Sequence, residues 1–271
     1  FGVVKKMRNT VEVLEIEQEN SPLPSVKFPK LKKLTLFDLT LKPWISQCKF
    51  ESLEELTLSA NCAVDECDLS NFFDFFYKLS TIKKLDIRKI CSTLIENAFE
   101  SLYELEAPKF ILTELMYRNK LPVSFHHSQK KNLEKITIEQ ASKRSILMAL
   151  RCSNLVELSV DTDKDFDNEY DYNDEEDVDE DGEFPINNSV RKLKLGANVS
   201  DELAQEILVA TPDIEELSVE FEIGDELFDF IVANMMKLVE INIFNKKSNL
   251  NSIIEKVKDL KNDKNLERNL K

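Results

Sequence analysis

The sequence contains few of the residues on which common enzyme sites depend. Its 271 residues include only 4 Gly and 2 His. No GxGxxG or GxxxxGK[ST] segment occurs, which excludes the usual glycine-rich phosphate loops. The histidines, His126 and His127, are adjacent in a polar stretch, and neither CxxC nor HExxH is present. We therefore expect a protein that is not an enzyme and that holds no cofactor or metal ion.

Long apolar runs and a regular cysteine pattern are also missing. No run of 18 or more apolar residues and no signal-peptide pattern occurs. The 5 Cys are an odd number without disulfide-like spacing, which indicates reduced thiols. We therefore expect an intracellular protein, cytoplasmic or nuclear. The chain begins at Phe1 rather than Met, which indicates a fragment or a processed chain.

The negative charge is concentrated in one segment. The chain carries a net charge of −15, and residues 161–183 hold 14 acidic residues against one Lys. The remaining sequence has 37 acidic and 35 basic residues and is nearly neutral. It has no basic stretch of the kind that nucleic-acid binding requires, so we expect no nucleic-acid or membrane partner. We interpret residues 161–185 as an acidic insertion loop.

A six-residue pattern recurs about every two dozen residues: apolar, two variable, apolar, one variable, apolar. Each copy alternates as a half-buried strand does. Two copies place Asn61 and Asn198 three residues after the last apolar position, which matches the leucine-rich-repeat pattern LxxLxLxxN. We expect such an Asn to be buried against backbone groups of a turn. The ten copies begin at Val11, Leu31, Leu53, Ile82, Leu102, Leu133, Leu155, Val190, Ile214 and Leu238.

Between several of these copies the apolar spacing changes to that of a helix. Residues 200–210 begin with Ser200, a suitable N-cap, and end before Thr211-Pro212. Leu203, Ile207 and Leu208 share one face of this predicted helix. Since neither a short strand nor a short helix can bury its apolar face alone, stacking supplies the core. Further helices are predicted at 71–79, 145–151 and from 224 onward, and a capping helix with a tail at about 248–271.

Three segments share motifs at the junctions between strands and helices. ALRCSNLVELSV ends a predicted helix at Cys152 and continues through Asn-Leu into a strand. ANVSDELAQEILVATPDIEELSV begins a helix with Ser-Asp-Glu-Leu and places Pro before the next strand, and EIGDELFDFI repeats that helix start. Together these segments resemble the cysteine-containing leucine-rich repeats of F-box proteins. The F-box itself does not occur in this sequence.

The repeats and this resemblance imply one domain over residues 1–271. The expected fold is an α/β leucine-rich-repeat solenoid, or horseshoe, of about ten repeats with parallel strands on the concave face and helices on the convex face. The resemblance implies the substrate-recognition part of an SCF-type E3 ubiquitin ligase. A Skp-type adaptor and a cullin would then bind through an F-box outside this chain. The alternative is a free-standing scaffold that binds basic, histone-like partners through the acidic loop.

Alternate strand residues are predicted to line the concave face. One column of them alternates in charge sign from Lys33 to Glu216, so that neighbouring strands would form a ladder of ion pairs or meet a partner of mixed charge. That column is Val13, Lys33, Glu55, Lys84, Glu104, Lys135, Glu157, Lys192, Glu216 and Glu240. Aromatic and Arg side chains on the same face are suitable interface anchors.

The acidic loop supports two interpretations. Asp161, Asp163 and Asp165 have the spacing of the first ligands of a calcium-binding loop, but Phe166 and Tyr172 stand where Gly and Glu are required. The loop is therefore either a solvated spacer or a docking segment for a basic protein. The candidate protein-binding residues are Phe37, Arg88, Glu157, Ser159, Asp161, Phe166, Tyr170, Tyr172 and Phe244.

Overall fold

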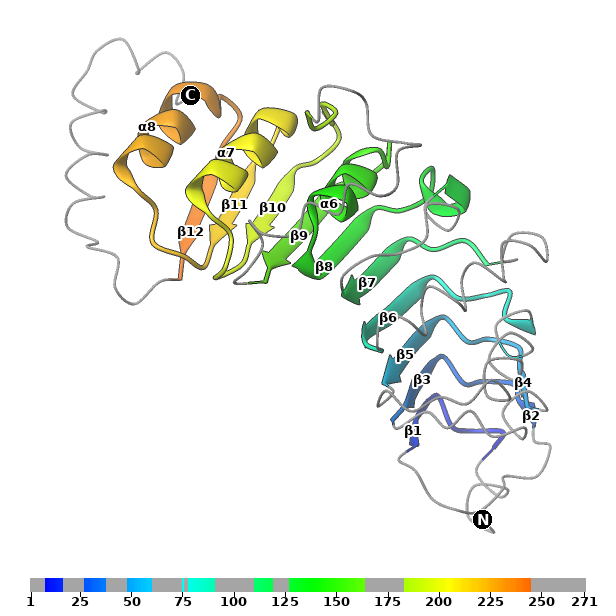
Figure 1. Ribbon diagram of the computed structural model, residues 1–271. Coiled ribbons are helices and arrows are strands. Elements are labelled where there is room, and N and C mark those ends of the chain that lie inside the picture. The colour runs from blue at the N-terminus through cyan, green and yellow to red at the C-terminus, as the bar shows by residue number, and fades with distance from the viewer. Residues whose placement is uncertain are drawn as a thin grey trace.

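The computed structural model describes residues 8–16, 27–37, 48–59, 75, 78–90, 110–118, 127–163 and 183–244. Ten strands in these ranges form one parallel sheet whose order follows the chain (Figure 1). A separate parallel pair, β2 (Lys27–Phe28) and β4 (Lys49–Phe50), lies outside that sheet. The ten strands are β1 (Val13–Ile16), β3 (Lys33–Leu36), β5 (Glu55–Ser59), β6 (Lys84–Lys89), β7 (Glu114–Arg118), β8 (Lys135–Ala141), β9 (Glu157–Thr162), β10 (Lys192–Leu195), β11 (Glu216–Val219) and β12 (Glu240–Ile243).

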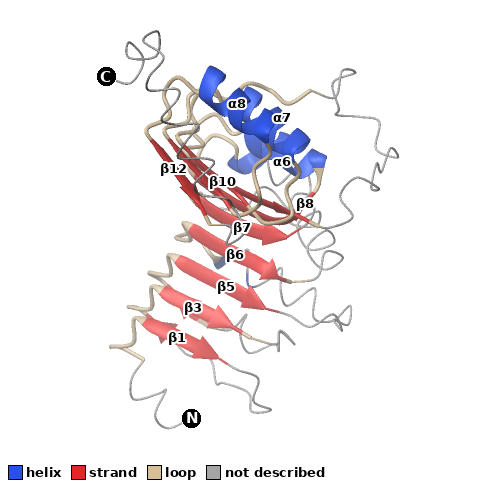
Figure 2. Ribbon diagram, turned by 90° about the vertical axis from the view of Figure 1, so that its left-hand side faces the viewer, coloured by secondary structure: helices blue, strands red, loops and turns tan. Residues whose placement is uncertain are grey.

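The alternation of apolar and polar residues divides the sheet into two faces. In β3, Leu34 and Leu36 are buried while Lys33 and Thr35 remain accessible, and most other strands repeat this pattern. The buried side chains join in one continuous apolar core. Figures 1 and 2 show the helices on one side of the sheet, and we call the opposite, polar side the open face. The chain is thus an α/β protein built on a ten-stranded parallel sheet.

Nine of the ten predicted strand segments belong to this sheet, and the fifth was wrong. The place between β6 and β8 is held by β7, which follows Leu112, and not by the copy that begins at Leu102. Residues 102–107 lie outside the described part of the chain. Both LYELEA and LTELMY fit the pattern, but LYELEA ends on Ala, whereas LTELMY ends on Tyr117, which is fully buried. The larger side chain fills more of the core and removes more apolar surface from water.

Three helices cover the buried face of the sheet at β8 to β12 (Figure 2). They are α6 (Lys143–Leu150), α7 (Asp201–Ala210) and α8 (Asp225–Asn234). The prediction for α7 is confirmed, since the Ser200 hydroxyl caps the helix by accepting from the backbone N–H of Leu203. Leu203, Ile207 and Leu208 are buried, as expected. Helix α6 begins two residues before its predicted start, because Ser142 and Ser145 form a reciprocal capping box there.

Aromatic packing closes the core near the N-terminus. Strands β2 (Lys27–Phe28) and β4 (Lys49–Phe50) pair with each other, a feature too short to predict from periodicity. The rings of Phe28 and Phe50 stack with centroids 5.7 Å apart, and Phe75 meets Phe50 edge-on at 5.9 Å. Phe75, in the segment predicted as a helix at 71–79, is buried in the core. Offset and edge-on pairs of this kind stabilise by about 0.5–1.5 kcal/mol beyond the area that they bury.

Several predicted features lie outside the described residues. They are the acidic stretch 164–182, the C-terminal stretch 245–271 with its expected capping helix, and Asn61. Within the described part of the chain, no helix has the length and apolar character needed to cross a membrane.

Candidate protein-binding surface

The open face presents its side chains in rows that run across the strands. Because the strands are parallel and in register, equivalent residues of neighbouring strands lie side by side, about 4.8 Å apart. The first row is Val13, Lys33, Glu55, Lys84, Glu114, Lys135, Glu157, Lys192, Glu216 and Glu240. The second row is Glu15, Thr35, Thr57, Asp86, Met116, Thr137, Ser159, Lys194, Ser218 and Asn242.

The first row forms the predicted ladder of ion pairs. Its member on the fifth strand of the sheet is Glu114 instead of Glu104, and the alternation of sign survives because both are Glu. The Lys135 Nζ atom lies 2.8 Å from the Glu157 carboxylate and 3.9 Å from that of Glu114. Three further pairs have Nζ to oxygen distances of 2.7, 3.1 and 2.7 Å: Lys33–Glu55, Lys84–Glu114 and Lys192–Glu216.

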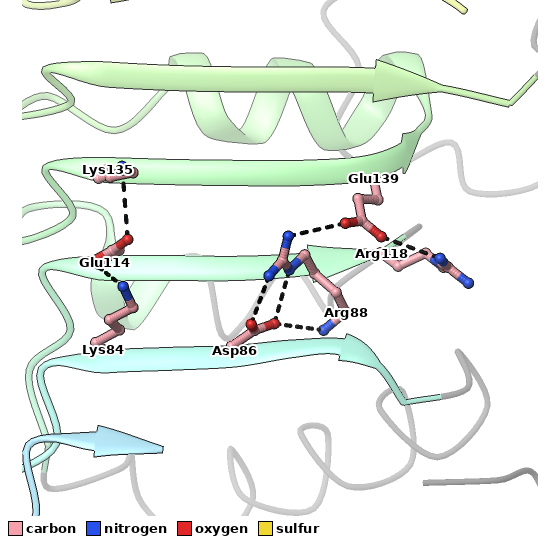
Figure 3. Close-up of polar contacts among 7 residues, drawn as sticks. All are labelled: Lys84, Asp86, Arg88, Glu114, Arg118, Lys135 and Glu139. Carbon is pink, nitrogen blue, oxygen red and sulfur yellow. Dashed lines mark hydrogen bonds and ion pairs between the residues drawn. The ribbon is translucent and has the colours of Figure 1, made fainter. Parts of the chain in front are cut away.

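A second set of ion pairs crosses β7 at the centre of the sheet (Figure 3). Arg88 donates from Nε and one terminal nitrogen to the two oxygens of Asp86, at 3.0 and 2.8 Å. Its other terminal nitrogen donates to Glu139 on β8 at 3.0 Å. The second oxygen of Glu139 accepts from Arg118 at 3.2 Å. The hydrogen bonds with Asp86 raise the pKa of Arg88 above its ordinary value, so its positive charge is fixed.

Two β-bulges shape this cluster. On β5 the chain advances two residues, from Thr57 to Ser59, while on β6 it advances three, from Asp86 to Lys89. Strand β6 therefore carries one extra residue. The same shift on β8 lies beside Gln140, whose φ of 51° is in the left-handed region. Each bulge places two consecutive residues toward the solvent, Arg88 with Lys89 on β6, and Glu139 with Gln140 on β8. Both partners of the ion pair across β7 therefore come from bulges.

The predicted anchors do not form one patch. Arg88 lies in the central cluster and is engaged by Asp86 and Glu139. Phe37 is half-buried after β3, and Phe244 is exposed after β12, with seven strands of the sheet between those two. Phe166, Tyr170 and Tyr172 lie outside the described residues.

Strand β9 brings together three of the predicted residues. Glu157 belongs to the ladder, and Ser159 is half-buried between Thr137 and Lys194 of the neighbouring strands. Asp161 accepts hydrogen bonds from the backbone N–H and the side-chain amide of Asn198, at 3.2 and 3.3 Å. Its carboxylate therefore fixes the turn after β10 and is not an uncommitted charge.

The buried asparagine is at a different position from the predicted one. Asn198 is exposed, which contradicts the expectation for LxxLxLxxN. Asn187, just before β10, is buried instead and donates to the carbonyl oxygens of Leu150 and Cys152, at 2.8 and 2.9 Å. It satisfies the end of α6, where carbonyl groups have no partner within the helix.

Met116 and Arg118 were missed because the fifth strand had been placed ten residues too early. Both belong to β7, and Met116 lies in the second row between Asp86 and Thr137. The signal that could have found them is the third apolar position of the pattern, where LTELMY has Tyr and LYELEA has Ala.

In the part of the chain that the structure describes, no group of three or more His, Cys, Asp or Glu side chains is arranged to hold a metal ion. No model of a known protein family matches the chain, and no curated protein shows significant similarity to it.

Proposed function

We propose that this chain is a leucine-rich-repeat solenoid that binds another protein on its open face. In this proposal the open face is the concave side of a horseshoe of about ten repeats, and the helices form the convex side. The observation that carries the proposal is the pair of residue rows that run without interruption across ten parallel strands. Such a surface holds many polar side chains at fixed spacing, which suits recognition of an extended protein surface.

The partner in this proposal is the substrate protein of an SCF-type E3 ubiquitin ligase. Support comes from the junction motifs that resemble the repeats of F-box proteins. Cys152 is buried where α6 ends and the chain turns toward β9. Ser200 and Gly224 occupy the N-cap positions before the two Asp-Glu-Leu helix starts. The adaptor and the cullin would be bound by an F-box that is not in this chain.

The test has two parts. The first is affinity purification of the full-length protein from cells of its source, with mass spectrometry to identify a substrate candidate and any Skp-type adaptor. In the second, the purified candidate is titrated with wild-type chain, with Ser159→Arg on the open face, and with Val209→Arg on the exposed side of α7. We expect Ser159→Arg to weaken binding at least tenfold and Val209→Arg to leave it unchanged.

The outcomes separate the alternatives. Equal binding by all three proteins would refute the open-face proposal. Binding that disappears only when residues 164–182 are removed would favour the scaffold alternative, in which the acidic loop captures a basic partner. Absence of any Skp-type adaptor from the full-length purification would remove the ligase assignment and leave protein binding in place.

A further inference from the structure

The centre of the open face combines an apolar side chain with a ring of charged residues. Met116 is the only apolar residue in the second row of the ten described strands. It is half-buried, with Asp86 and Thr137 beside it on the neighbouring strands. Glu114 and Arg118 precede and follow it by two residues on β7, so they point to the same face.

Seven charged side chains on β6, β7 and β8 lie around this position, and we call them the ring. Figure 3 shows them in two ion-paired groups, so each has at least one partner in the ring. Four are cations and three are acids: Lys84, Arg88, Arg118 and Lys135, with Asp86, Glu114 and Glu139. These seven groups sum to a net charge of +1, and Glu157, which pairs with Lys135 at 2.8 Å, brings the local balance to zero in a chain whose net charge is −15. Lys89 is exposed beside Arg88 and makes this local balance positive.

Arg118 is the group that remains most available to a partner. Its side chain is 45% exposed, the largest value in the ring, whereas that of Asp86 is 14% exposed. Its ion pair in the ring is a single contact of 3.2 Å with Glu139. An incoming carboxylate can therefore reach its guanidinium without breaking the two hydrogen bonds between Arg88 and Asp86.

This arrangement matches the physical requirements of an interaction hot spot. Such spots have a central side chain that becomes fully desolvated and a surrounding ring that excludes water. Methionine suits the centre because its flexible, polarisable side chain adapts to different apolar groups. The ion pairs hold the ring in place before binding, so less conformational entropy is lost on association.

We infer that Met116 and Arg118 form the central contact for a partner segment that presents an apolar side chain next to an Asp or Glu. The apolar side chain packs on Met116, and the carboxylate pairs with Arg118. This inference rests on the proposed function and specifies where on the open face the partner binds and which chemistry it presents.

The test uses random 12-residue peptides displayed on phage and selected on the wild-type protein. Selection is repeated with a counter-selection against the Met116→Ser/Arg118→Glu double variant. We expect the enriched peptides to share an apolar residue adjacent to Asp or Glu. A synthetic copy of one enriched peptide should bind Met116→Ser and Arg118→Glu at least tenfold more weakly than wild type. Val209→Arg, on the exposed side of α7 and away from the open face, should bind it normally.

A charge swap separates recognition from damage to the fold. A peptide in which Lys replaces the acidic residue should bind Arg118→Glu better than it binds wild type, a reversal that unfolding cannot produce. Thermal unfolding of each variant checks the fold independently. Failure to enrich any such peptide, or binding insensitive to both Met116 and Arg118, overturns the inference. If Ser159→Arg still blocks the natural partner in that case, the open-face proposal itself survives.

Discussion

At the scale of single residues, buried and half-buried polar side chains hold several of the turns between strands and helices. Asn187 bonds the end of α6, Asp161 bonds the turn at Asn198, and the Thr162 hydroxyl donates to the Asn198 carbonyl at 2.5 Å. Asp201 accepts from the backbone N–H of Gly224 at 3.0 Å, which links the starts of α7 and α8. These contacts lie behind or beside the open face, so we expect their loss to change stability rather than recognition.

Asn187→Ala tests the importance of the buried amide. The Leu150 carbonyl would lose its donor inside the protein, whereas the Cys152 carbonyl would keep the backbone N–H of Leu155. An unsatisfied buried group costs about 1–3 kcal/mol, and we expect the free energy of unfolding in urea to fall by that amount. Asn154→Ala is the matched control, because its amide donates to Lys131 at an exposed position. Equal losses in the two variants would contradict this account.

We expect replacement of glycine by alanine to destabilise the protein more at Gly196 than at Gly224. A Cβ at Gly196 would lie within 3.0 Å of three Asp161 atoms, including its Cβ, so the Asp161 side chain cannot simply rotate away. A Cβ at Gly224 would meet only the tip of the Asp201 side chain that closely. We expect Gly196→Ala to lower the free energy of unfolding by about 1–3 kcal/mol, and Gly224→Ala by less than about 1 kcal/mol. Chemical denaturation of both variants measures the difference, and the reverse order would refute the explanation.

The buried Cys152 thiol should make the stability of the protein decrease at alkaline pH. Burial raises the pKa of Cys152 from 9.0 to about 12, because the thiolate is poorly solvated there. The unfolded chain loses this proton first as pH rises, so the stabilisation is fully present below pH 9 and is lost between pH 9 and about 12. Burial also raises the pKa of Tyr117, which acts in the same direction.

Urea unfolding at pH 8, 9 and 10 measures this effect. Each raised group contributes at most about 1.4 kcal/mol per pH unit to the decline. Cys152→Ala lowers stability at every pH by leaving a cavity, but we expect its stability to decline less steeply above pH 9 than that of the wild type. Parallel declines in the two proteins would show that Cys152 does not contribute.

At the scale of elements, the buried Leu, Ile and Val residues hold the strands together, and the polar rows favour one register between neighbouring strands. Lateral ion pairs recur on both ends of the sheet, from Lys33–Glu55 to Lys192–Glu216. Each exposed pair contributes only about 0.2–1 kcal/mol, so the ladder favours correct register more than it adds stability. A slip of one residue would turn the leucines outward as well.

The ladder predicts that the cost of a charge reversal depends on the number of acidic neighbours. Lys135→Glu places three Glu residues on adjacent strands, whereas Lys33→Glu creates one like-charged pair. We expect Lys135→Glu to be the more destabilising, by about 1 kcal/mol at low salt. The difference should shrink in 1 M NaCl, where the Debye length is about 3 Å. Thermal unfolding at both salt concentrations checks this, and a gap that does not respond to salt would argue for packing as its cause.

Local patterns predicted most of the elements because each depends on residues close in sequence. Alternating Leu residues define the strands, and Ser200 defines the start of α7. The fifth strand was misassigned because two neighbouring segments fit the same pattern. The contact between Arg88 and Glu139 could not be predicted, since it joins two strands that are not neighbours and crosses β7, the strand that the sequence pattern had misplaced. The choice of Asn187 over Asn198 likewise depends on where α6 ends in space.

At the scale of the whole molecule, the acidic segment differs from the rest of the chain in its charge and composition. Residues 164–182 carry 11 acidic residues and one Lys, so their removal changes the net charge from −15 to −5. The flanking strands β9 and β10 pair directly with each other in continuous register. We therefore expect the sheet to form without the segment.

Replacement of residues 164–182 by a short Gly-Ser linker tests this expectation. Thr162 must be kept, because its hydroxyl holds the turn at Asn198. We expect the midpoint of thermal unfolding to stay the same or to rise slightly, as self-repulsion of the acidic residues is removed. A loss of cooperative unfolding would show that the segment is part of the folded structure.

Site-specific photo-cross-linking tests the central claim, binding on the open face, most directly. A photoreactive benzoylphenylalanine is placed at Thr137 on the open face, or at Val209 on the exposed side of α7, in cells of the source. The account predicts a discrete cross-linked protein from position 137, lost when Arg118→Glu is added, and none from position 209. Cross-links only from position 209, or none from position 137, would contradict it.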